Sequence, residues 1–214
     1  MSAGAISNVS PDRSIGRLRR RSRDELLDEL AAIFAEGGFA DVSVGELARR
    51  LRCSRSTLYQ MAPTHDDLVL AALGHVFCRI WRRANEAAAA EHGAAAKLQT
   101  WALTVIEGAG VLTPRLRGDI VGWEPSRSAL EASLREGLAD FAILFDAAIE
   151  AGEVRPANTL FAFQWLQAAC SLANDPVFLQ ASGLTHRAAL EEIRQAFFSG
   201  FVISDDRQGI AVTG

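Results

Sequence analysis

Helix start and stop signals follow one another so closely in residues 22–68 that only short helices fit between them. Ser22 and Ser43 are each followed three residues later by Glu, which is the pattern of a capping box at a helix N-terminus. Gly37-Gly38 is expected to end the first helix, and Pro63 disfavours helix at the residue before it. The segment therefore predicts three short helices in succession.

The third of these helices is too polar to belong to a core. It opens on Ser54-Arg-Ser-Thr, Leu58 is its inward anchor, and Tyr59 is expected to be exposed. Two short helices joined by a tight turn, the second of them carrying hydroxyls and an Arg, are typical of a helix-turn-helix that binds DNA. Residues 22–68 are therefore predicted to form a DNA-binding domain.

The distribution of charge agrees with a local anionic partner. The net charge is −4, so this chain cannot bind nucleic acid through an overall excess of positive charge. Its arginines instead gather in residues 13–23 and 49–55. A flexible tail plus a solvated helix face would give the same pattern. We predict that residues 1–21 form a disordered basic arm. The arginines that could add phosphate or minor-groove contacts from this arm are Arg17, Arg19, Arg20 and Arg21.

The rest of the chain also predicts helices, and no alternation of apolar residues indicates a strand. The predicted helices cover residues 64–91, 94–111, 114–122, 126–151, 156–173 and 185–202. We therefore predict an all-α fold. The DNA-binding domain would be followed by a helical ligand-binding and dimerisation domain over residues 69–205 and by a flexible tail over residues 206–214.

The last two long helices are apolar on nearly all sides. The apolar residues of the first are Leu160, Phe161, Phe163, Trp165, Leu166 and Leu172, and those of the second are Leu190, Ile193, Phe197, Phe198, Phe201 and Val202. A helix that is apolar all round must be covered all round. A second copy of the chain is the simplest cover, so we expect a two-fold homodimer through these helices. Burial within one subunit is the alternative.

Several other classes of protein are not indicated. Cys53, Cys78 and Cys170 are odd in number and far apart, which argues against a disulfide framework or a zinc site. No signal peptide is visible and the longest apolar stretches are too short to span a bilayer, so we expect a cytoplasmic protein without membrane contact. No GxSxG elbow, phosphate-binding loop or HExxH motif is present. We therefore expect neither enzymatic activity nor a cofactor or metal.

The order of residues in LLDELAAIFAEGGFADVSVGELARRLRCSRSTLYQMAPTHDDL resembles the TetR family of bacterial transcriptional regulators. The Gly after the first helix, the Ser-Val that opens the second, the Ser-x-x-Thr-Leu-Tyr of the third and the Pro that follows all coincide. The resemblance implies that residues 43–50 form the positioning helix and residues 54–60 the recognition helix in the major groove.

The resemblance also implies a set of DNA contacts. Arg55 would bind a guanine edge or a phosphate, and Tyr59 a phosphate. Ser43 and Thr64 stand at helix N-termini, where backbone N–H groups face an anion. The predicted DNA-binding residues are Ser43, Ser54, Arg55, Ser56, Thr57, Tyr59, Gln60, Thr64 and His65.

Three positions depart from the family pattern. Arg52 stands where the family has a turn Gly, so a backbone position that favours positive φ must carry a side chain, at a cost of about 1 kcal/mol. Ala62 replaces a large aromatic residue, and His65 replaces a phosphate-binding Lys. These departures support a second interpretation, a degenerate dimeric helical protein with weak or no DNA binding.

The second domain is rich in aromatic residues. Those on helices expected to enclose its interior are Trp81, Trp101, Trp123, Phe141, Phe145 and Phe163. In TetR-like proteins this region holds an inducer pocket, so the resemblance implies a small lipophilic or aromatic ligand bound among these side chains. Ordinary core packing is the alternative for each. The implied function is a repressor that an inducer releases from a palindromic operator on double-stranded DNA.

Overall fold

The structure is a computed structural model that describes residues 21–201, and in this range it contains helices and no β-sheet. The helices are α1 (Arg23–Gly37), α2 (Val44–Arg50), α3 (Arg55–Met61), α4 (His65–Ala89), α5 (Ala94–Gly108), η1 (Ala109–Val111), α6 (Pro114–Gly122), α7 (Glu124–Glu150), α8 (Thr159–Ala173), α9 (Pro176–Ser182) and α10 (His186–Phe201). The all-α prediction is confirmed. None of the described helices combines the length and apolarity that crossing a bilayer requires.

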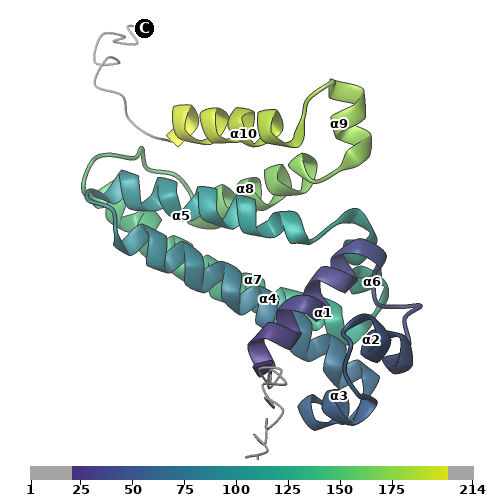
Figure 1. Cartoon of the computed structure of the whole chain (residues 1–214). Coiled ribbons are helices and arrows are strands. Elements are labelled where there is room, and N and C mark those ends of the chain that lie inside the picture. Colours follow the sequence, from purple (N-terminus) through teal and green to yellow (C-terminus); the bar gives the residue numbers. More distant parts are fainter. Residues whose placement is uncertain (1–20, 202–214) are drawn as a thin grey trace, which may run out of the picture.

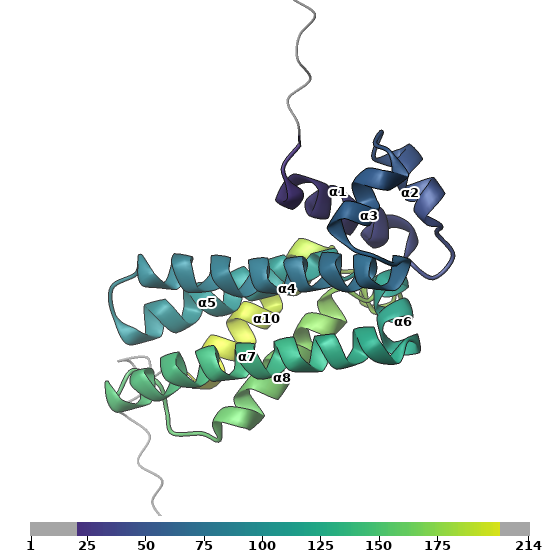
Figure 2. The same cartoon turned by 90° about the horizontal axis from the view of Figure 1, so that it is seen from below.

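The helices form two regions that α4 connects. Helices α1, α2 and α3 make a small domain at one end of the molecule (Figure 1). Helix α4 leads from this domain into a larger body, where it packs against α5 and α7. Helices α8 and α10 pack on each other at the end opposite to α3, and α6 lies beside the small domain (Figure 2).

The start of α1 is the capping box that the sequence predicts. Ser22 Oγ accepts from the N–H of Glu25 at 3.1 Å, and the N–H of Ser22 donates to the Glu25 carboxylate at 2.7 Å. Gly38, with φ of 74°, ends the helix, and the ring of Phe39 packs back on Phe34 with 6.0 Å between centroids. The predicted bounds of α1 are therefore confirmed.

The second predicted capping box is wrong in one half. Ser43 Oγ accepts from the N–H of Glu46 at 3.2 Å, as expected. The Glu46 carboxylate, however, binds the Arg49 guanidinium, with 2.9 Å between Nε and Oε2. Arg49, one turn further along the helix, forms an ion pair with Glu46. It therefore competes with the backbone N–H of Ser43, which the capping pattern takes as the partner of the Glu46 carboxylate. The start of α2 after Ser43 is unaffected.

The turn between α2 and α3 is built around a left-handed arginine. Arg52 has φ of 51°, which confirms the backbone conformation expected there. The N–H of Cys53 donates to the carbonyl of Ala48 at 3.0 Å, the long bond of a Schellman motif. The Arg21 guanidinium donates to the carbonyls of Leu51 and, at 3.4 Å, Arg52. Arg21 therefore stabilises the end of α2. Its neighbours in the predicted arm, Arg17, Arg19 and Arg20, lie outside the described residues.

Helices α8 and α9 differ from the helices predicted for this part of the chain. Helix α8 begins after Asn158, whose side chain accepts from the N–H of Phe161 at 2.8 Å, and so starts later than predicted. Helix α9, Pro176–Ser182, was expected to be loop, and this expectation is wrong. Asp175 caps α9 by accepting from the N–H of Val177 at 2.9 Å, and proline is well tolerated in a first turn.

The core of the larger region is an aromatic cluster centred on Phe141 of α7. The Phe141 ring lies 5.8 Å from Trp101, 5.2 Å from Phe145 and 5.5 Å from Phe163, centroid to centroid. All four side chains are fully buried. Aromatic pairs at these distances add to the stabilisation that burial itself provides.

Candidate nucleic-acid interface

Helix α3 is held by one buried side chain and presents the rest of its surface to solvent. Leu58 is buried in the small domain, whereas Arg55, Ser56 and Gln60 are exposed. Ser54 caps the helix by accepting from the N–H of Thr57 at 3.0 Å. The helix therefore exposes a row of donors and acceptors of the kind that bind phosphates and base edges.

Tyr59 lies on this exposed face. It is the single tyrosine of the chain, and half of its surface (50%) is accessible. A phenol exposed to this extent contributes little to the core, and its hydroxyl is free to donate to a phosphate oxygen. Tyr59 and Gln60 thus share the surface on which the sequence predicts DNA contacts.

The guanidinium of Arg55 lies across the first turn of α2 at Gly45. A Cβ at Gly45 would come within 2.5 Å of Arg55 Nη2, so glycine leaves room for this placement. Arg49 is paired with Glu46 and Arg50 with Glu36. In residues 21–201 Arg55 has no such acidic partner, so its donors remain available to a nucleic acid.

The predicted contacts at the start of α4 have a different environment. Thr64 Oγ1 accepts from the N–H of Asp67 at 3.0 Å and donates to the Asp67 carboxylate at 2.7 Å. Asp66 stands on the same turn. Two carboxylates at this helix N-terminus oppose the approach of a phosphate.

His65 is turned toward the protein. Its side chain is 30% exposed, Nδ1 lies 3.5 Å from Asp66 Oδ1, and Nε2 is buried without a hydrogen-bond partner among the described residues. The ring lines a hollow together with Phe39, Asp119 and Trp123. The structure thus places His65 at the contact between the small domain and α6, apart from the exposed face of α3.

Asp119 of α6 connects the larger region to the small domain. Its Oδ2 accepts from the N–H groups of Phe39 at 2.6 Å and Ala40 at 3.0 Å, and its side chain is only 9% exposed. Gly38 makes this approach possible, because a Cβ there would lie 2.2 Å from the same oxygen. The turn after α1 is therefore built around a carboxylate from α6.

Two further contacts lie on the same helix. Thr113 Oγ1 donates to the carbonyl of Ala35 at 2.7 Å, and Arg115 Nη2 lies 2.7 Å from the Asp41 carboxylate. Together with Asp119, these residues attach the first two turns of α6 to the end of α1 and the turn that follows it.

Comparison with known proteins identifies the small domain. Residues 26–72 match the model of the family described as bacterial regulatory proteins, tetR family. Residues 26–72 are therefore similar to the DNA-binding domain of TetR-family regulators. A search of curated proteins finds no match. The family resemblance that the sequence indicates is confirmed.

Solved structures of transcriptional regulators share the fold of this chain over both of its regions. NemR of E. coli in its reduced form is 18% identical, with a TM-score of 0.70 over 83% of this chain and 96% of that chain. FadR of Bacillus subtilis in complex with stearoyl-CoA is 14% identical, with a TM-score of 0.68 over 82% and 97%. A putative transcriptional regulator of Saccharomonospora viridis in complex with choline is 15% identical, with a TM-score of 0.68 over 84% and 96%.

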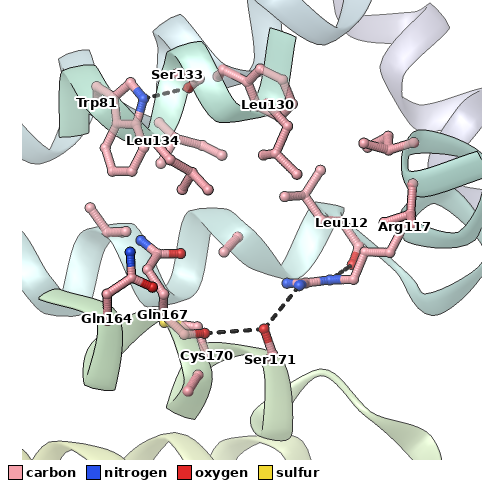
Figure 3. A pocket seen from close by; sticks show the side chains of 17 residues that line it. Trp81, Leu112, Arg117, Leu130, Ser133, Leu134, Gln164, Gln167, Cys170 and Ser171 are labelled. Atoms are coloured by element: carbon pink, nitrogen blue, oxygen red, sulfur yellow. Dashed lines mark hydrogen bonds between the residues drawn. The ribbon is translucent and has the colours of Figure 1, made fainter. Parts of the chain in front are cut away.

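The larger region contains a cavity of about 420 Å³ between α4, α6, α7 and α8 (Figure 3). Of the six aromatic residues predicted to bind a ligand, Trp81 lines it. Trp101, Phe141, Phe145 and Phe163 form the buried cluster described above. Trp123 packs against the Phe39 ring of the small domain, with 5.8 Å between centroids.

The polar lining of the cavity is a set of residues that the sequence did not single out. Arg117 enters from α6, and the polar side chains on α8 are Gln164, Gln167 and Ser171 (Figure 3). An arginine on a short helix and two glutamines are ordinary surface residues in a sequence. No local pattern distinguishes them, because their common orientation depends on how α6 and α8 pack.

Proposed function

We propose that the protein is a transcriptional repressor that binds a palindromic operator as a homodimer and is released by a small-molecule inducer. The observation that carries the proposal is the exposed polar face of α3, where Arg55 has no acidic partner within residues 21–201 and Tyr59 stands half exposed. In a dimer two such helices would enter successive major grooves about 35 Å apart.

The alternative is a degenerate protein with weak or no DNA binding. Selection of bound fragments from random DNA by the full chain tests both, since a recovered palindrome supports the repressor. The affinity for that palindrome should fall steeply as salt rises, because phosphate contacts release counterions. Failure to enrich any sequence at modest ionic strength would favour the alternative.

Arg55→Ala is expected to lose about 1–3 kcal/mol of discrimination between the selected operator and random DNA. The reason is that an unpaired guanidinium on the exposed face of α3 is the group best suited to a bidentate contact with guanine. Titration of labelled operator and of scrambled DNA by fluorescence anisotropy measures the difference. Arg82→Ala, an exposed arginine on α4, is the control and should change neither affinity. An equal loss on both DNAs would make Arg55 a phosphate contact.

The homodimer is proposed from the surface of α8. This helix contains no charged residue, yet one of its faces is exposed. The large exposed residues on that face are Leu160, Phe161 and Leu172. An uncharged face with large apolar side chains on a surface helix is typical of a protein–protein interface. The exposed side of α10 carries charges, such as Glu191 and Glu192, so the proposal depends mainly on α8.

Phe161→Asp is expected to weaken the dimer at least about tenfold, because it places a charge on each side of an apolar contact. Phe161 is 63% exposed in one subunit, so the change should leave the fold of that subunit intact. Sedimentation velocity over a range of concentrations measures the dissociation. Val177→Asp, which changes an exposed apolar residue on α9, is the matched control. A wild-type chain that sediments as a monomer at micromolar concentration would contradict the proposed dimer.

Release by an inducer is proposed from the two faces of α6. Arg117, Ile120 and Val121 line the cavity, whereas Thr113 and Asp119 hold the small domain. A ligand that binds better to one position of α6 shifts the population toward that position, by as much as its affinities for the two differ. That two structural neighbours were solved with stearoyl-CoA and with choline supports a ligand site in this fold.

A further inference from the structure

We infer that the cavity binds an apolar monocarboxylate, with Arg117 as the counterion of its carboxylate group. The inference deepens the proposed function, because it assigns a chemical class to the inducer. It depends on three observations about the cavity. Arg117 is the only charged side chain among the described residues that line it, several N–H donors of the lining have no acceptor among the described residues, and the rest of the wall is mostly apolar.

The charge of the cavity is uncompensated. Among the described residues that line it, Arg117 is the only one with a charged side chain. Its Nε donates to the carbonyl of Leu112 at 2.7 Å and its Nη1 to Ser171 Oγ at 3.1 Å, so both acceptors are neutral. A guanidinium has five N–H donors, and the described residues leave the remaining ones without an acceptor.

The guanidinium of Arg117 is partly buried, which makes its charge less favourable without an anion. Desolvation lowers the pKa of the Arg117 guanidinium. The thiol of Cys170 lines the same cavity, and burial raises its pKa to about 12, so it stays neutral and does not balance the charge. Arg117 is only partly removed from water, and an anionic ligand that covered its remaining donors would offset the desolvation of its charge.

Further donors line the same cavity. The side chains of Gln164 and Gln167 point from α8 into the cavity (Figure 3), and their amides make no hydrogen bond within residues 21–201. Guanidinium and amide groups together offer the planar, charge-assisted donors that a carboxylate accepts. A phosphate monoester carries about −1.5 to −2 at pH 7, so one guanidinium would leave negative charge unbalanced in an apolar site.

The remainder of the wall suits an apolar body. The apolar side chains that line it include Phe77, Ile80, Trp81, Val105, Ile120 and Leu134. The indole N–H of Trp81 is already bound to Ser133 Oγ at 2.7 Å, so Trp81 presents its apolar ring to the cavity. The volume of about 420 Å³ lies within the range of pockets that bury small organic ligands.

The test compares ligands that differ only in the polar group. Isothermal titration of the full chain would use dodecanoate against dodecan-1-ol, and 4-butylbenzoate against 4-butylbenzyl alcohol, all below their aggregation limits. We expect at least one carboxylate to bind about 10- to 100-fold more tightly than its alcohol. Dodecyltrimethylammonium, with the opposite charge on the same tail, should bind more weakly than the alcohol.

Variants of Arg117 test whether this residue causes the preference for the carboxylate over the alcohol. In Arg117→Gln the carboxylate and its alcohol should bind within about threefold of each other, while Arg117→Lys should keep part of the preference because it keeps the charge. Arg127→Gln, which changes an exposed arginine on α7 outside the lining, should behave as wild type. The inference is overturned if neither carboxylate binds, if the alcohols bind as tightly, or if the preference survives in Arg117→Gln.

The titration contains no DNA, so its result is separate from that of the proposed function. Operator binding without carboxylate binding would end this inference and leave the repressor with another ligand. Carboxylate binding that depends on Arg117 but does not release the operator would establish the site and contradict the proposed mode of release.

Discussion

Replacing Phe141 by alanine is expected to lower the free energy of unfolding by about 3–5 kcal/mol. Phe141 is fully buried, and its ring contacts the rings of Trp101, Phe145 and Phe163 at centroid distances between 5.2 and 5.8 Å. Truncation removes these contacts and leaves a cavity that the surrounding helices fill only in part. Urea unfolding followed by circular dichroism measures the loss, at equal protein concentration because the proposed dimerisation would shift the apparent stability.

Ile143→Ala is the matched control. Ile143 lies on the same helix but is 70% exposed, so this change should stay within about 0.5 kcal/mol of wild type. A Phe141→Ala variant that unfolds like wild type but binds ligand less well would contradict the core assignment. It would return Phe141 to the ligand-binding role that the sequence predicts for it.

The small domain could be predicted almost residue by residue, because its boundaries are set by local chemistry. The caps at Ser22, Ser54 and Thr64 each satisfy a backbone N–H three residues further on, and this requirement does not depend on the remainder of the fold. The positive φ of Arg52 was also predictable, since a tight turn between two helices needs it whichever residue stands there.

The cavity could not be predicted in the same way, because it depends on packing between distant helices. The sequence gives no reason to prefer Trp81 over Trp101 as a ligand-binding residue. The two rings stack on each other, with 5.7 Å between their centroids. Trp81 also packs against Gly137 of α7, where a Cβ would lie 2.6 Å from its ring. Trp81 reaches the cavity wall, whereas Trp101 is fully enclosed. Aromatic content alone therefore locates the core of this region better than it locates a ligand.

Helix α9 could not be predicted from the sequence for a different reason. Asp175-Pro176 is a valid helix start, but the segment that follows is short and ends at Gly183 with φ of 68°. Seven residues carry too little periodicity to be distinguished from a loop.

The sequence does not single out Arg117 as a cavity residue for a related reason. An arginine is presumed exposed until the packing of α6 on α8 is known.

Asp119→Ala is expected to loosen the turn after α1 and to disconnect the small domain from the ligand cavity. The substitution removes the carboxylate that accepts from the N–H groups of Phe39 and Ala40, at a cost of about 2–4 kcal/mol for two charge-assisted hydrogen bonds. Amide hydrogen exchange at these two positions should accelerate about 30-fold or more, because the opening free energy falls by that amount. Exchange measured by NMR on the unliganded chain reports this directly.

The same variant should bind operator but lose most of its response to ligand. Coupling between two sites in proteins is typically about 1–3 kcal/mol, and here Asp119, Thr113 and Arg115 are the described contacts through which α6 would transmit it. Asp140→Ala is the control, since Asp140 accepts from Asn85 at 2.8 Å and so joins α7 to α4 within the larger region. It should leave both the exchange at Phe39 and the ligand response unchanged. If Asp119→Ala accelerates exchange but a ligand still releases the operator fully, the signal must travel through α4, which is continuous between the two regions.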